Sequence, residues 1–150
     1  MNELVRASHL ILIGTAQETR VAEVISEGAD DEFPTRTLHT TVAVEEVLGT
    51  SKPKGCVVVS TDELAFRSPG IQDWREGGRR VLLFLTRSPD PNDPGVHVVA
   101  NLTPFQAAYF VVGNELEITV PPGTDVDGLN RRIAAMSLPD LRERVKAVQP

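Results

Sequence analysis

The residues best suited to chemistry surround one tryptophan in the stretch "RSPGIQDWREGGRR". Trp74 is the only tryptophan of the chain, and basic residues gather near it: Arg75, Arg79, Arg80 and, further along, Arg87. Guanidinium groups form paired hydrogen bonds with carboxylates and phosphates. The pattern therefore predicts a ligand-binding patch of Trp74, Arg75, Arg79 and Arg80 for a carboxylate, a phosphate or a peptide. Asp73 and Glu76 interleave with the arginines, which is also typical of a solvated turn.

The histidines do not form a metal-binding pattern. His9, His39 and His97 lie far apart in the sequence, and no two of them have the spacing of two residues that places ligands on one strand face. A structural zinc site needs four ligands, commonly cysteine and histidine at short spacings. The stretch "DPNDPG" resembles a calcium loop only superficially, because Asn101 stands where the bidentate glutamate belongs. We expect no metal and no cofactor, and the histidines fit exposed strand positions.

No catalytic arrangement is recognisable in the sequence. It contains neither a Gly-x-Ser-x-Gly elbow nor a phosphate-binding Gly-x-x-x-x-Gly-Lys loop. Glu45 and Glu46 are adjacent in an expected strand and so point to opposite faces. Cys56, the single cysteine, is interpreted as a small buried hydrophobic residue, with a reactive thiol as the alternative. We therefore name no catalytic residue, while an enzyme that uses residues scattered in the sequence stays an open alternative.

The composition is that of one ordinary globular domain. The chain has 150 residues, of which 41% are hydrophobic and 24% charged. The net charge of −6 disfavours nucleic acid and anionic membrane surfaces as partners. The first apolar run, Leu10 to Ile13, is too short for a signal peptide, and no run is long enough to span a membrane. The chain as written indicates a cytoplasmic protein, although a trimmed secreted chain would look the same.

The first 120 residues have the pattern of β-strands. A long strand is expected over "HLILIGTAQETRVAEVIS", with Gly14 marking a bulge or bend. Apolar and polar residues alternate over 38–47, which predicts a half-buried antiparallel strand ending near Gly49. The run 81–86 predicts a fully buried strand, and Gly113-Asn114 a two-residue hairpin turn. Six or seven strands with bends at glycine favour a small closed or partly open barrel.

The last thirty residues change to a helical period. Apolar residues recur at spacings of three and four over 126–136 and again over 138–148, which predicts two short amphipathic helices. Ser137 followed by Pro139 and Asp140 is typical of a helix start. The apolar stripes must cover something: the end of the barrel, or a second copy of the chain in a helix-mediated dimer. We expect a single domain over 1–150, with a barrel over 4–120 and a helical appendage over 124–148.

Three segments occur in an order that resembles a known domain. They are "SHLILIGTA", "TTVAVEEVLGTSKPKGCVVV" and "WREGGRRVLLFL". Together they are similar to a widespread bacterial domain of OB-like, TIMP-like (netrin-module-like) barrels of unassigned function. The resemblance implies this fold and a frequent occurrence in secreted proteins or lipoproteins, but no catalytic residue. Protease inhibition of the TIMP kind is not implied, because the chain begins Met1-Asn2-Glu3 without the cysteine it needs.

The function we expect is that of a non-enzymatic interaction module. Loops 27–36 and 62–79 would present its binding surface to an unknown protein or a small anionic ligand. The alternative is an OB domain that binds single-stranded nucleic acid by stacking bases on exposed aromatic side chains. The sequence has seven aromatic residues and an acidic net charge, which argues against this alternative.

Overall fold

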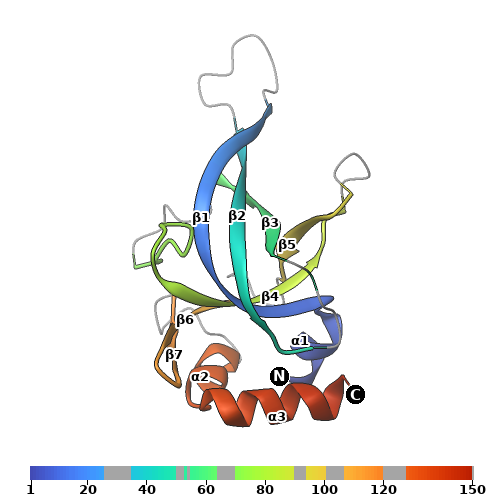
Figure 1. Cartoon of the computed structure of the whole chain (residues 1–150), viewed down its shortest axis with the longest axis vertical. Helices are drawn as coiled ribbons and strands as arrows, with labels where there is room; N and C mark the ends of the chain where they lie inside the picture. Colours follow the sequence, from blue (N-terminus) through green and yellow to red (C-terminus); the bar gives the residue numbers. More distant parts are fainter. Residues whose placement is uncertain are drawn as a thin grey trace.

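A computed structural model describes residues 1–25, 35–49, 53, 55–63, 70–89, 94–100, 107–119 and 128–149. Its elements, in chain order, are α1 (Asn2–Ala7), β1 (Leu10–Ile25), β2 (Thr35–Val47), β3 (Cys56–Asp62), β4 (Arg80–Arg87), β5 (Val96–Val99), β6 (Ala108–Val112), β7 (Glu115–Ile118), α2 (Leu129–Ala134) and α3 (Leu138–Val148). The mainly β class and the two C-terminal helices predicted from the sequence are confirmed (Figure 1).

Five of the strands are linked pairwise into a ring. The sheet order is β1-β2-β3-β5-β4-β6-β7, and β1 also pairs with β4. All of these pairings are antiparallel except β3–β5, which is parallel and aligns only three residue pairs. This short parallel contact makes the ring less regular than a clear barrel. The hairpin of β6 and β7 extends the sheet from β4, and the turn predicted at Gly113-Asn114 is confirmed.

Gly14 permits β1 to pair with both β2 and β4. Residues Leu10 to Thr15 pair with β4, while β2 pairs along nearly the whole strand, with a register shift between Ile13 and Gly14. A Cβ atom at Gly14 would lie 2.3 Å from the backbone oxygen of Ala43. Only glycine permits β1 and β2 to approach this closely, so the predicted bulge is confirmed with its steric cause.

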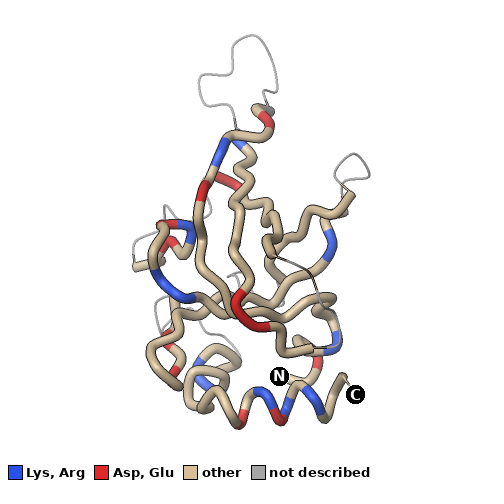
Figure 2. The backbone as a smooth tube through the Cα atoms, in the orientation of Figure 1, with Lys and Arg blue, Asp and Glu red and all other residues tan. Residues whose placement is uncertain are grey.

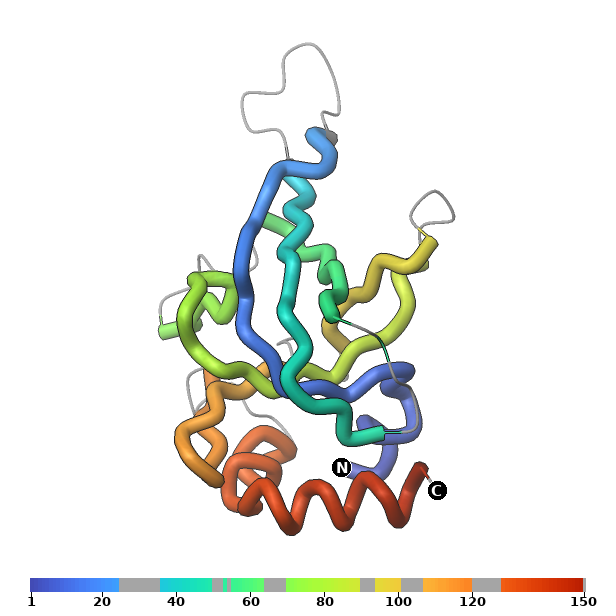
Figure 3. The backbone as a smooth tube through the Cα atoms, in the orientation of Figure 1, coloured from blue at the N-terminus to red at the C-terminus, as the bar shows by residue number. Residues whose placement is uncertain are grey.

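Beyond Thr15, the described part of β1 pairs with β2 alone, and the ribbon that these two strands form is joined by β3 along Thr37–Ala43 of β2. Pairing with β4 ends at Thr15, but pairing with β2 continues to Ile25. In Figures 1 and 3 this ribbon rises beyond the other strands as the blue and cyan arm. Its side chains include Val21 and Val24, which are 48% and 54% exposed. The ribbon is therefore the part of the described sheet with the least cover.

The C-terminal helices close the base of the molecule. The apolar stripe of α3, namely Leu138, Leu141 and Val145, is buried in the same core as the strands. The Ser137 hydroxyl accepts a hydrogen bond from the Asp140 backbone N–H at 3.3 Å, so the predicted helix start is confirmed. The stripe is thus covered within the chain, where α3 also contacts α1. Figure 1 shows α2 and α3 beneath the sheet.

Two expectations about single side chains are wrong. Cys56 is exposed, because Val57 and Val59 occupy the inward positions of β3 and alternation turns Cys56 outward. His39 is only 7% exposed, although it was expected on an open strand face. Alternation predicts which face a residue joins, but not what covers that face. In the described part of the chain, no helix is long and apolar enough to cross a membrane.

Candidate functional site

The turn over 70–79 is docked onto the sheet, and Trp74 is part of the core. The Trp74 side chain is 0% exposed. The turn is tied to the end of β7 by a hydrogen bond from the Gln72 N–H to the Thr119 carbonyl at 2.8 Å. An indole buried in this way offers no face to a ligand. The expectation that Trp74 belongs to an exposed patch is therefore corrected: its role is to anchor the turn.

Arg75 is a structural clamp. Its side chain is 8% exposed, and its Nε and Nη2 donate to the two carboxylate oxygens of Asp73 at 2.9 and 3.0 Å. Nη1 donates to the Thr61 hydroxyl at 3.0 Å and to the Asp62 carbonyl at 3.3 Å. The guanidinium thus joins the turn to the end of β3, and its hydrogen-bonding capacity is largely used inside the protein.

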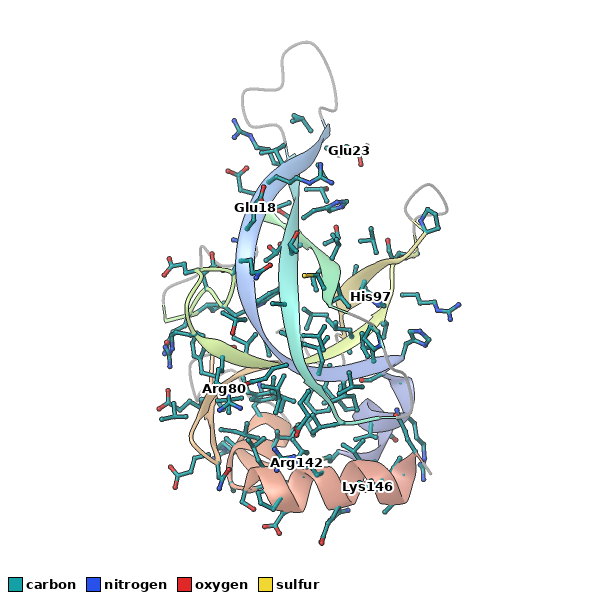
Figure 4. The ribbon with its side chains drawn as sticks, in the orientation of Figure 1. Glu18, Glu23, Arg80, His97, Arg142 and Lys146 are labelled. Carbon is teal, nitrogen blue, oxygen red and sulfur yellow. The ribbon has the colours of Figure 1, made fainter. Side chains whose placement is uncertain are left out.

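Arg80 is exposed but paired. Its Nε donates to Oε2 of Glu45 on β2 at 2.8 Å, and both side chains are about half exposed. Glu46, the next residue on β2, accepts instead from Nε of Arg142 on α3 at 2.9 Å. Figure 4 shows Arg80 on the sheet and Arg142 on the helix beneath it. The two adjacent glutamates therefore serve separate ion pairs, as expected from their opposite faces.

Arg79 is the member of the predicted patch that faces a cavity. Its guanidinium carbon lies 3.6 Å above the centre of the Phe110 ring, and Nη2 is 3.3 Å from Oε2 of Glu117. The cation is attracted to the electron-rich face of the ring. The side chain stays 47% exposed. Phe110 and Glu117 are direct partners across the β6–β7 hairpin, so the hairpin register brings both contacts of Arg79 together.

A pocket of about 450 Å³ opens between the turn and β6. It is lined by Ile71, Gln72, Asp73, Glu76, Gly77, Arg79 and Phe110. This volume lies within the range of sites that bind small molecules or single side chains. The Asp73 carboxylate is occupied by Arg75, whereas the Gln72 and Glu76 side chains lie at the exposed rim. Arg79 over Phe110 therefore gives the pocket a cationic floor, and Gln72 and Glu76 offer hydrogen-bond acceptors at the rim.

The charges around this pocket disfavour a small anion. Arg75 compensates the charge of Asp73, and Glu76 and the nearby Glu117 oppose the positive charge of Arg79. Figure 2 shows basic and acidic residues next to one another along the turn at 70–80. An incoming carboxylate or phosphate would have to displace Glu117 from Arg79. The structure thus separates the four predicted residues into an anchor (Trp74), a clamp (Arg75), a surface ion pair (Arg80) and a pocket floor (Arg79).

Sequence reasoning missed Phe110 and Glu117 as members of the site. A signal for them was present, because a two-residue turn at Gly113-Asn114 aligns Val112 with Glu115 and hence Phe110 with Glu117. What the sequence did not provide was the pairing of Val81 with Phe110, which brings Arg79 onto this hairpin. Of the predicted binding loops, residues 26–34 and 64–69 lie outside the described residues.

Comparisons with known proteins identify no family for this chain. No protein-family model matches it, and no curated protein is similar enough to be reported as a relative.

Proposed function

We propose that the protein is a non-enzymatic binding module that captures a peptide or protein partner through one planar side chain. The observation that supports this is the Arg79 guanidinium, which lies over the Phe110 ring with its carbon 3.6 Å from the ring centre and is half exposed in a pocket of about 450 Å³. The guanidinium carbon lies over the ring, and Arg79 and Phe110 both line the pocket. Aromatic side chains anchor many protein interfaces in this way.

The side chains at the rim of the pocket determine which kind of planar ligand group is favoured. Gln72 and Glu76 offer oxygen acceptors beside the floor, so a ring that carries an N–H donor is favoured over a plain hydrocarbon ring. Indole fits this description, since it stacks on a guanidinium and donates one hydrogen bond. The acidic rim favours such a ligand over the small anion considered from the sequence.

The test is an NMR titration with a matched pair of small probes. N-acetyl-tryptophanamide supplies the indole, and N-acetyl-leucinamide supplies a similar backbone without a ring. We expect saturable shifts of the Arg79 Nε–H and of the 70–79 amides with the first probe only. Arg79→Lys keeps the charge but removes the planar group, so it should weaken binding by about tenfold, which is 1.4 kcal/mol.

Arg80→Gln is the matched control, because it removes a neighbouring arginine that does not line the pocket. Binding by this variant should equal that of the unchanged protein. Equal shifts with the leucine probe, or none with either probe, would refute the pocket as a recognition site.

We also propose the OB-like, TIMP-like fold for the ring of β1 to β5. The five-stranded ring and the long connection between β1 and β2 support this assignment.

The same ring order favours one second candidate, a single-stranded nucleic-acid-binding OB domain. Against it, the aromatic residues in the described ranges are buried: Trp74, Phe84, Tyr109 and Phe110. A labelled oligothymidine that gives no salt-sensitive shift at ~50 mM salt would remove this candidate.

A further inference from the structure

We propose that the groove between α1 and α3 is a two-fold interface at which a second copy of this chain binds. The groove has a volume of about 640 Å³ and lies between the first and the last helix of the described fold. Its charged residues are Arg6, Asp140, Glu143 and Arg144. It shares no residue with the Arg79 pocket, so the inference does not depend on the function proposed above.

The residues of α3 that line the groove have a spacing that is the same in both directions. They are Asp140, Glu143, Arg144 and Ala147, at spacings of three, one and three, and all four are exposed. Residues three and four apart lie on one face of a helix, so the four form a single stripe. When two copies of such a helix pack antiparallel about a two-fold axis, the stripe faces itself. Glu143 then lies opposite Arg144 of the second copy, and Asp140 lies opposite Ala147.

Arg6 lies beside the C-terminal end of α3. The Arg144 side chain donates to Asn2 Oδ1 at 3.4 Å, and the Gln149 side chain donates to the Val5 carbonyl at 2.6 Å. Progress along α1 therefore follows α3 toward its end, and Arg6 is placed next to that end. In the antiparallel contact, this end faces the start of the second copy's α3, where the acidic residue of the first turn lies.

The two-fold contact would pair every charge of the groove. Arg6 faces Asp140 of the second copy, Arg144 faces Glu143, and the axis repeats each pair. Within one chain these charges are not compensated in this way: among the described residues, none of the four forms an ion pair, whereas Arg142 of the same helix does. Complementary charges of this kind determine the register and the choice of partner.

The order of the charges favours a second copy over another partner. A partner has to present bases opposite Asp140 and Glu143 and acids opposite Arg6 and Arg144, and α1 and α3 of the same chain do so when reversed. Figure 2 shows residues of both signs along α3 at the base of the molecule. The 11 residues of α3 span only about 16 Å, so the contact is small. We expect a weak dimer, with a dissociation constant on the order of 100 µM.

The experiment is sedimentation velocity of the full chain between about 10 µM and about 1 mM. We expect the average mass to rise from 16.3 kDa toward twice this value as the concentration increases. Because the pairs are exposed, about 0.5 M sodium chloride should weaken the association.

Two charge reversals test the register. Arg144→Glu places Glu143 opposite a second glutamate, and Glu143→Arg places Arg144 opposite a second arginine. Each variant alone should associate at least about tenfold more weakly than the unchanged protein. An equal mixture of the two variants should associate again, since every reversed residue then faces the opposite charge. Lys146→Glu is the matched control: it makes the same change in net charge on the same helix, but Lys146 does not line the groove, so association should not change.

A chain that stays monomeric at about 1 mM overturns the proposal and leaves the groove to a partner of another kind. The register is also refuted if Lys146→Glu weakens association as much as Arg144→Glu, or if two folded variants do not associate in the mixture. If a variant does not fold, amide shifts of the unchanged protein on dilution decide. Shifts centred on α1 and α3 support the interface, and shifts centred on other elements refute it.

Discussion

Replacing Trp74 with alanine should destabilise the protein severely. The indole is 0% exposed and belongs to the central core cluster, so its removal leaves a large cavity. Truncation of a buried tryptophan costs about 3–5 kcal/mol. For a domain of this size, this lowers the melting temperature by about 6–20 °C, at about 2–4 °C per kcal/mol. Trp74→Phe keeps an aromatic ring in the core and should lower the free energy of unfolding less than Trp74→Ala.

The assay is urea unfolding followed by far-UV circular dichroism, because the substitution also removes the only tryptophan. Val112→Ala is the control: Val112 is 50% exposed, and its loss should change the free energy of unfolding by no more than about 0.5 kcal/mol. In the unchanged protein, Trp74 fluorescence should be shielded from acrylamide.

A loss below about 1 kcal/mol for Trp74→Ala, together with free quenching by acrylamide, would refute the reasoning. The turn over 70–79 would then be undocked in solution. In that case Trp74 would become available for a ligand, and the separation of the four patch residues into different roles would fail.

Two further predictions concern the sheet. Gly14→Ala should lower the free energy of unfolding by about 1–3 kcal/mol or more, since its Cβ would lie 2.3 Å from a backbone oxygen of β2. In the same urea assay, Gly49→Ala should lower the free energy of unfolding less, because its contact is the end of a flexible side chain. Stability should fall as pH drops below about 6.5, because burial, His9 and Arg87 lower the pKa of His97, so the unfolded chain takes up the proton first. Urea midpoints at pH 8, 6.5 and 5 should show a smaller decline for His97→Gln than for the unchanged protein; an equal decline would contradict this account.

The elements were predictable because local rules decide them. Period-two alternation located β2, the buried run 81–86 located β4, and the capping pattern at Ser137 located α3. These signals lie within a few residues of the element that they specify. The parallel pairing of β3 with β5 has no such signal, because it joins segments whose contact depends on the whole ring.

The site was less predictable for the same reason. The type and spacing of residues identified the right turn, but burial depends on what packs over it. Trp74 and Arg75 resemble a binding patch in sequence and become anchor and clamp only when β3 and β7 are placed beside the turn. Arg79 acquires its role from Phe110, about thirty residues away in sequence.

The contact between the two ends of the described fold has a kinetic consequence. The Gln149 side chain donates to the Val5 carbonyl at 2.6 Å and to the Ser8 carbonyl at 3.1 Å, across sequence separations of 144 and 141 residues. Closing so long a loop costs chain entropy before its contacts contribute. During synthesis, α1 leaves the ribosome long before the residue that fixes it. The base of the domain should therefore be its last part to acquire native protection from hydrogen exchange.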